Sequence, residues 1–98
     1  MNVYPRDIDA VAEQLPEVEE CAAFAYPSKK YGEIIALAIV RREGFEISSE
    51  EIKKYCSKRL ADFQQPQKVF IVDRLPKNTM GKIQRKSILN YLHRLGLD

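Results

Sequence analysis

The sequence predicts a single small α+β domain: three main strands, with room for extra short ones, form a sheet covered by helices. Three observations predict it. Apolar residues recur at helical spacing in three segments. Three other segments are short and mostly apolar, as strands are, and prolines or glycines separate the helical segments from the strand segments. The chain has 98 residues, 45% hydrophobic and 31% charged. A chain of this size builds one core and no deep cavity, so it would handle a substrate at a surface shared with a partner.

The first half of the chain predicts one helix and two strands. Pro5 suits the first position of a helix whose apolar residues recur at i, i+3, i+4 and i+7, and Pro16 ends that helix. Residues 17–26 predict a strand that stops at Pro27. Residues 33–42 predict a second strand. Because its middle is apolar on both faces, we expect it at the centre of the sheet.

The second half predicts a helix, a strand and a final helix. Ser48 and Glu51 have the spacing of a capping box, in which each residue bonds the backbone of the other. Residues 68–73 predict the third strand and residues 84–95 the last helix. The apolar positions that we expect to be buried are Ile52, Tyr55, Cys56 and Leu60 behind the cap, and Ile88, Leu92 and Leu95 in the last helix.

Composition argues against several classes of protein. Two cysteines and one histidine make neither a disulfide framework nor a zinc set, so we expect no metal bound by this chain. Cys21 lies in an apolar strand and Cys56 on the apolar face of a helix, so we expect both thiols in the core. The longest apolar run, residues 34–40, is too short to span a bilayer, and the N-terminus has no apolar signal region. We therefore expect a cytoplasmic protein without a membrane span.

The net charge of +2 conceals an asymmetry. Most acidic side chains lie in the first half, and no carboxylate side chain lies between Arg74 and Leu97. A basic field of this kind attracts anions such as phosphates, nucleotides or nucleic acid. The alternative is that the basic half faces the acidic half or a partner.

A basic loop, residues 76–82 (PKNTMGK), follows the third strand. Pro76 is expected to end the strand and Gly81 to allow a turn, so that Lys82 stands at the tip just before a helix. The segment is not a P-loop, because Pro76 and Ile83 replace the required glycine and hydroxyl residue. Three interpretations stay open: a solvated loop, a nucleic-acid contact without interleaved aromatic side chains, or a lysine inserted into a partner's anionic site.

Four motifs occur in a fixed order along nearly the whole chain: residues 2–9 (NVYPRDID), 31–33 (YGE), 60–63 (LADF) with Pro66 and Lys68, and 76–82 (PK…GK) with Arg85. Together they resemble the C-terminal lid domain of adenylate-forming enzymes, which include acyl-CoA synthetases, firefly luciferase and the adenylation domains of nonribosomal synthetases. The form of residues 78–82 resembles malonyl-CoA synthetase-like members.

The resemblance implies that residues 1–98 are a single C-terminal lid domain, part of an acid–thiol ligase. The large N-terminal domain, which binds ATP, its magnesium ion and a carboxylic acid, is absent from this sequence, as are the hinge and glycine-rich loop before residue 2. The chain would be an excised domain or a natural fragment. We expect it to need an N-terminal adenylation domain, in cis or in trans, and to show no ligase activity alone.

The resemblance also implies roles for single residues. Lys82 takes the place of the catalytic lysine that stabilises charge as acyl-adenylate forms. The lid then rotates and offers another surface to CoA, near which Tyr31 and Phe63 would lie. Some members contact the CoA phosphates through basic residues at two positions where this chain has glutamines, residues 65 and 67. Lys68, one step away, would substitute if the loop shifts.

The predicted function is therefore the lid of an ATP-dependent carboxylate–CoA ligase. One alternative is a non-catalytic module that binds an adenylation partner or a carrier protein. A second is a small basic nucleic-acid-binding domain, although we expect no nucleic acid among the partners. The acid, whether fatty, aryl or short dicarboxylic, stays open because its pocket belongs to the missing domain. Lys77 and Arg85 either assist Lys82 or hold its loop by helix capping and surface pairs, and we favour the second role.

Overall fold

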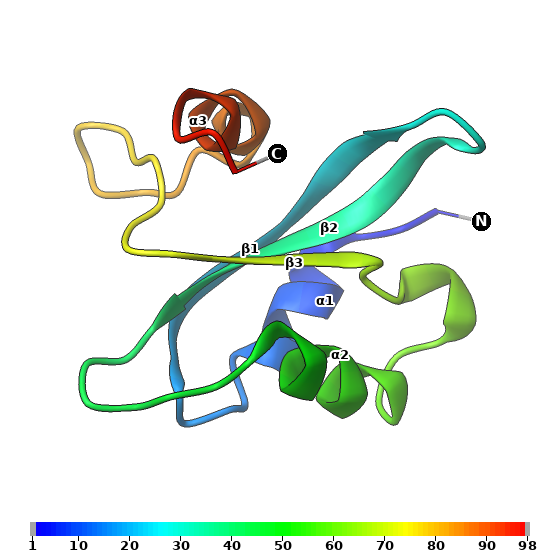
Figure 1. The fold of residues 1–98 in the computed structure, drawn as a ribbon, viewed down its shortest axis with the longest axis horizontal. Coiled ribbons are helices and arrows are strands. Elements are labelled where there is room, and N and C mark those ends of the chain that lie inside the picture. The colour runs from blue at the N-terminus through cyan, green and yellow to red at the C-terminus, as the bar shows by residue number, and fades with distance from the viewer. Residues whose placement is uncertain (1, 98) are drawn as a thin grey trace.

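The computed structural model describes residues 2–97 and contains one three-stranded sheet (Figure 1). Strands β1 (Val18–Ser28) and β2 (Gly32–Arg41) form an antiparallel hairpin. Strand β3 (Lys68–Val72) pairs with β2 in parallel, so the order is β1-β2-β3. The predicted α+β class and the central position of the second strand are confirmed.

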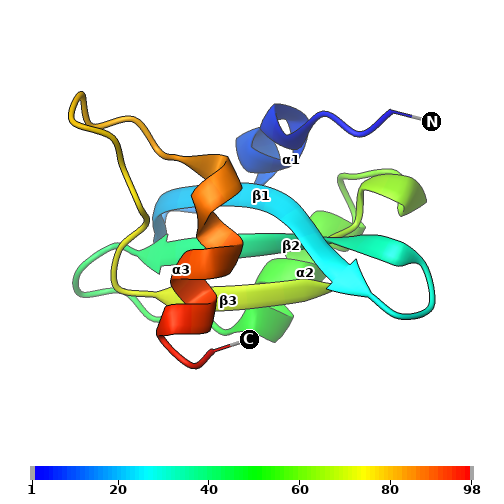
Figure 2. The ribbon, with the colours of Figure 1, turned by 90° about the horizontal axis from the view of Figure 1, so that it is seen from above.

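Helices cover both faces of the sheet. Helices α1 (Pro5–Ala12) and α2 (Ser49–Ser57) lie on one face, and α3 (Ile88–Arg94) crosses the other, as Figure 2 shows from above. Two short 3₁₀ helices, η1 (Asp62–Gln64) and η2 (Arg85–Ser87), precede β3 and α3. Each of the helices that the structure describes is too short or too polar to cross a bilayer.

The two faces of the sheet bury separate cores, whereas one core was expected, because a sheet covered by helices on both sides has two apolar faces. Toward α1 and α2 the hairpin buries Cys21, Ala23, Leu37 and Ile39, and toward α3 it buries Ala22, Phe24, Ala36 and Ala38. Successive side chains of a strand point to opposite faces, which explains the alternation. Because β2 has a strand on either side and helices above and below, its middle is apolar throughout.

Helix α2 begins as the sequence predicts. The Ser48 hydroxyl accepts a hydrogen bond from the Glu51 N–H at 3.1 Å, and the Ser48 N–H donates to the Glu51 carboxylate at 3.1 Å. Of the four positions expected to be buried behind this cap, Tyr55 and Leu60 are only half-buried. Leu60 lies beyond the end of the helix at Ser57 and packs on the edge of the core.

Two boundaries in the first half differ from the predictions. Helix α1 ends at Ala12, before Pro16, because its last turn tightens: the Leu15 N–H donates to the Ala12 carbonyl at 3.1 Å. Strand β1 does not stop at Pro27 but runs on to Ser28. It lies at the edge of the sheet, where a residue without an N–H donor is tolerated.

The last helix is also shorter than predicted. Its first turn is the 3₁₀ helix η2, and α3 proper starts at Ile88. Ile88 and Leu92 are fully buried against the sheet, as expected. Leu95 is exposed, so its predicted burial is wrong, because α3 ends at Arg94 and the chain turns away through Gly96, at φ +72°.

Candidate functional site

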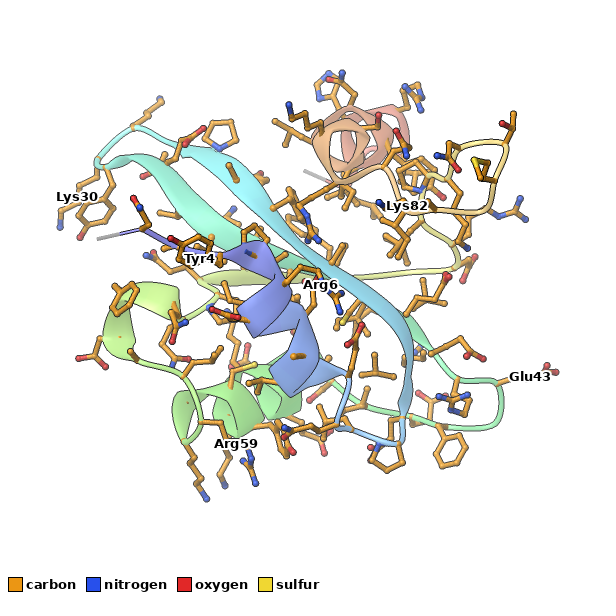
Figure 3. All side chains as sticks on the ribbon, turned by 180° about the vertical axis from the view of Figure 1, so that it is seen from behind. Tyr4, Arg6, Lys30, Glu43, Arg59 and Lys82 are labelled. Atoms are coloured by element: carbon orange, nitrogen blue, oxygen red, sulfur yellow. The ribbon has the colours of Figure 1, made fainter. Side chains whose placement is uncertain are left out.

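Lys82 lies on a short hairpin of residues 76–84, here named the lysine loop. An isolated antiparallel bridge between Lys77 and Ile83 closes this loop, and the Gln84 N–H donates to the Pro76 carbonyl at 2.9 Å. Strand β3 has already ended at Val72, so Pro76 opens the loop rather than terminating the strand. The loop projects from one end of the molecule, where Figure 3 labels Lys82.

The turn at the tip of the lysine loop depends on Asn78 and Gly81. Gly81 has φ +83°, a conformation that favours glycine, and its N–H donates to the Asn78 carbonyl at 3.0 Å. The Asn78 side-chain oxygen accepts from the N–H groups of Met80 and Lys82, each at 2.9 Å. Sequence reasoning missed Asn78, although an asparagine that bonds the backbone two residues on is a common turn device.

The ammonium of Lys82 is open to solvent. Its residue is exposed, and within residues 2–97 no carboxylate pairs with it. The helix expected just behind Lys82 starts one residue later than residue 84, the predicted start. Ile83 and Gln84 complete the hairpin, and helical backbone starts at Arg85.

Arg85 anchors the base of the lysine loop to a buried carboxylate. Asp9 on α1 is 1% exposed, and the Arg85 guanidinium donates to it at 2.9 Å and to the Ala23 carbonyl at 2.7 Å. The Ala23 N–H donates to Asp9 at 2.7 Å, and Arg6 adds a bond at 3.3 Å. A buried carboxylate is stable only with such partners. This cluster, the Asp9–Arg85 clamp, therefore ties α1, β1 and η2 together.

A second ion pair holds the other arm of the lysine loop. The Lys77 ammonium lies 2.8 Å from the Glu20 carboxylate on β1, and both side chains are partly exposed. Lys77 and Arg85 thus both tie the loop to the body of the domain, the second of their two predicted roles, although neither caps a helix. Lys82 differs from both because its ammonium forms no ion pair with any carboxylate in residues 2–97.

The opposite end of the molecule, here named the aromatic end, carries Tyr31 and Phe63. Tyr31 lies in the β1–β2 turn, is 62% exposed, and its N–H donates to the Ser28 hydroxyl at 3.2 Å. The Lys30 ammonium lies 5.2 Å from its ring centroid. Phe63 lies on η1 and is 40% exposed. Figure 3 shows Lys30, in the same turn as Tyr31, far from Lys82.

A groove of about 440 Å³ lies beside Phe63, between η1, the start of β2 and the segment that leads into α1. Gln65 and Gln67 line this groove. They occupy the two positions at which the resemblance implies basic residues in some members. The Gln65 amide donates to the carbonyls of Cys56 at 3.1 Å and Leu60 at 2.7 Å. Gln65 therefore fastens the end of α2 to η1.

Lys68 does not line this groove. Its ammonium lies 4.7 Å from the ring centroid of Tyr26, which packs against Phe70 at 5.6 Å between ring centroids, on the α3 side of the sheet. The structure therefore brings Tyr31 and Phe63 to one end of the molecule and gives Lys68 a separate aromatic partner.

The two cysteines are core residues, as expected. Burial, with a smaller contribution from the Asp9 carboxylate, raises the pKa of Cys21 to about 12, and burial also raises the pKa of Cys56. Both thiols thus stay protonated at neutral pH and are poor nucleophiles. In the part of the chain that the structure describes, no three His, Cys, Asp or Glu side chains are grouped so as to hold a metal ion.

Similar proteins point to one family. Residues 7–82 match the AMP-binding enzyme C-terminal domain. An oxalate–CoA ligase of Arabidopsis thaliana is 44% identical over 90 residues, which cover 92% of this chain and 18% of that ligase. The chain thus spans less than a fifth of this relative.

Solved structures agree with this assignment. Apo and ATP-bound MatB from Rhodopseudomonas palustris have TM-scores of 0.87 and 0.86 at 35% and 33% identity, covering 100% of this chain and 19% of theirs. A double mutant of o-succinylbenzoate CoA synthetase from Bacillus subtilis, bound with a product analogue, has a TM-score of 0.83 at 31% identity, covering 92% of this chain and 18% of its own. The chain belongs to the AMP-binding enzyme C-terminal domain family.

Proposed function

We propose that this chain is the lid domain of an ATP-dependent carboxylate–CoA ligase and works with an N-terminal adenylation domain in cis or in trans. The observation that carries the proposal is the exposed Lys82, which has no ion pair within residues 2–97, on a loop fixed at its tip and at its base. The similar proteins include CoA ligases and an ATP-bound structure, which supports ATP and CoA as the other substrates.

In the first half-reaction, a carboxylate oxygen of the acid attacks the α-phosphorus of ATP, and the bond to pyrophosphate breaks. Lys82 places a compact positive charge beside the oxygens on which negative charge builds up. A fixed charge that acts in the transition state lowers the barrier, and removing one comparable donor costs about 2.7–4 kcal/mol. The N-terminal domain would hold ATP, its magnesium ion and the acid.

In the second half-reaction, the CoA sulfur attacks the carbonyl carbon of the adenylate and AMP leaves. The exposed rings of Tyr31 and Phe63 offer stacking surfaces to the adenine of CoA, and the groove beside Phe63 offers room for an extended chain. Lys68 is a weaker candidate, since its ammonium would have to leave the ring of Tyr26 to reach a phosphate.

The two half-reactions would use opposite ends of the domain. The molecule is 33 Å along its longest axis, and the lysine loop and the aromatic end lie toward the two ends of that axis (Figure 1). One orientation of a rigid domain cannot bring both ends to the same reacting atoms. This separation supports a lid that rotates between adenylate formation and thioester formation.

Reconstitution tests the proposal. The chain alone, the N-terminal domain of a matching ligase alone, and their mixture would each be given ATP, CoA and a panel of fatty, aryl and short dicarboxylic acids. We expect turnover by the mixture and none by the chain alone. Turnover by the chain alone, or a mixture no faster than the N-terminal domain alone, would contradict the proposal.

A further inference from the structure

We propose that Asn78 is a positioning residue for Lys82: its side-chain amide oxygen fixes the backbone from which the reacting ammonium extends. This inference rests on the proposed role of Lys82 in adenylate formation. It concerns a residue that touches neither ATP nor the acid, and that acts through the lysine loop alone.

Asn78 forms two hydrogen bonds with the backbone of Lys82, one through its side chain and one through its own backbone. The Asn78 side-chain oxygen accepts from the Lys82 N–H at 2.9 Å, and the Asn78 N–H donates to the Lys82 carbonyl at 2.9 Å. The same side-chain oxygen accepts from the Met80 N–H at 2.9 Å. The Asn78 side chain therefore holds the N–H groups of Lys82 and Met80, whereas the Lys82 carbonyl is held by the Asn78 backbone and by the Gln84 amide.

Few other bonds hold the tip of the loop: the Gly81 N–H donates to the Asn78 carbonyl at 3.0 Å, and the Gln84 side-chain amide donates to the Lys82 carbonyl at 3.3 Å. Gly81, directly before Lys82, has φ +83° with open space around it, and glycine has the largest backbone freedom of all residues. Met80 is 90% exposed, so no packing holds the tip from outside. The bridge between Lys77 and Ile83 closes the base of the hairpin, and the Asn78 side-chain oxygen accepts from the N–H groups of Met80 and Lys82 nearer the tip.

When a lysine ammonium has no ion pair, the backbone of that lysine determines where the ammonium can reach. Lys82 has no ion pair within residues 2–97, so its long stem is directed by the placement of its Cα atom. A reacting group misplaced by about 1 Å can lose about 10²-fold in rate. Loss of the Asn78 side chain should therefore weaken the step that uses Lys82 and spare the step that uses the opposite end of the domain.

Two substitutions of Asn78 distinguish the effect of the turn geometry on Lys82 from the effect of a charge near Lys82. Aspartate offers the same acceptor oxygen as asparagine, whereas alanine offers none. An Asn78→Asp variant should therefore keep the turn while adding a negative charge near Lys82. Asn78→Ala removes the acceptor without adding charge. Thr79, the next residue in the same turn, is exposed, and Thr79→Ala serves as the matched control.

The test measures both half-reactions in the ligase assembled from this domain and its N-terminal adenylation domain. For Asn78→Ala we expect about a 10²-fold lower kcat of adenylate formation, with the KM for ATP unchanged, and an unchanged rate of thioester formation from supplied acyl-adenylate. Amide hydrogen exchange at Met80 and Lys82 should speed up in Asn78→Ala and stay slow in Asn78→Asp. Thr79→Ala should match the parent domain throughout.

Each outcome decides the proposal. If Lys82→Ala abolishes adenylate formation while Asn78→Ala does not slow it, positioning by Asn78 is wrong and the proposed function stands. Equal losses in both half-reactions for Asn78→Ala, or a raised KM with unchanged kcat, would assign Asn78 a general structural or binding role and overturn the proposal. If Lys82→Ala itself leaves adenylate formation intact, the proposed function fails, and the positioning role fails with it.

Discussion

The lysine loop and the aromatic end both present an exposed side chain on a turn, yet they are held by different means. The lysine loop combines a bridge, the side-chain bonds of Asn78, and ion pairs at both arms. The Tyr31 turn is held by the β1–β2 ladder and one bond to Ser28. A side chain that must contact a reacting atom needs a tightly restrained backbone, whereas a ring that stacks on a ligand tolerates more positional freedom.

The largest difference between the two ends is the buried anchor behind the lysine loop. Arg85→Ala would leave the Asp9 carboxylate buried with only Arg6 and one N–H as partners, so we expect a loss of about 3 kcal/mol in the free energy of unfolding. Urea unfolding measures this loss. Arg94→Ala, at the exposed end of α3, is the control and should change stability by less than about 0.5 kcal/mol.

Arg85→Lys sharpens the same prediction. A lysine keeps the charge but cannot make the forked contact with Asp9 and the Ala23 carbonyl, so its stability should fall between the parent and Arg85→Ala. A loss below about 1 kcal/mol for Arg85→Ala would show that the clamp does not anchor the loop.

Two glycines make a matched comparison between the ends. Gly81 in the lysine loop has φ +83° and Gly32 beside Tyr31 has φ +81°, and an added Cβ would meet nothing within 4 Å at either position. Each Gly→Ala change should therefore cost about 1–2 kcal/mol from backbone strain alone. Adenylate formation should slow only in Gly81→Ala, and thioester formation only in Gly32→Ala. If both variants changed the rates of adenylate formation and thioester formation in the same way, the assignment of the two ends to two half-reactions would be contradicted.

Removing an exposed ring tests the aromatic end. We expect Phe63→Ala and Tyr31→Ala each to raise the KM for CoA about fivefold, which corresponds to about 1 kcal/mol of lost stacking. Adenylate formation should not change in either variant, and unfolding stability should shift by less than about 0.5 kcal/mol in Tyr31→Ala because Tyr31 is 62% exposed. An unchanged KM for CoA in both variants would remove these rings from the CoA surface.

The smallest effect is expected for the pair of Lys77 with Glu20. Both side chains are partly exposed, so a double-mutant cycle with alanine should give a coupling of less than about 1 kcal/mol that weakens in high salt. A larger, salt-independent coupling would place this pair beside the Asp9–Arg85 clamp as an anchor of the loop.

The features that depend on local sequence were predictable. The Ser48 and Glu51 spacing led directly to the cap of α2, and the two-faced apolar run placed β2 at the centre of the sheet. Boundaries were less certain, because an edge strand accepts Pro27 where a central strand would not. The Asp9–Arg85 clamp was not predictable, since its members lie 76 residues apart and meet only through tertiary packing.

The most direct test of the account follows Lys82→Ala through each half-reaction in single turnovers, with the N-terminal domain present. We predict that formation of acyl-adenylate slows about 10²–10³-fold. Thioester formation from supplied acyl-adenylate and CoA should keep its parent rate, because we propose that this step uses the aromatic end. Equal losses in the two half-reactions, or no loss in either, would contradict the assignment of the two ends of this domain to two steps.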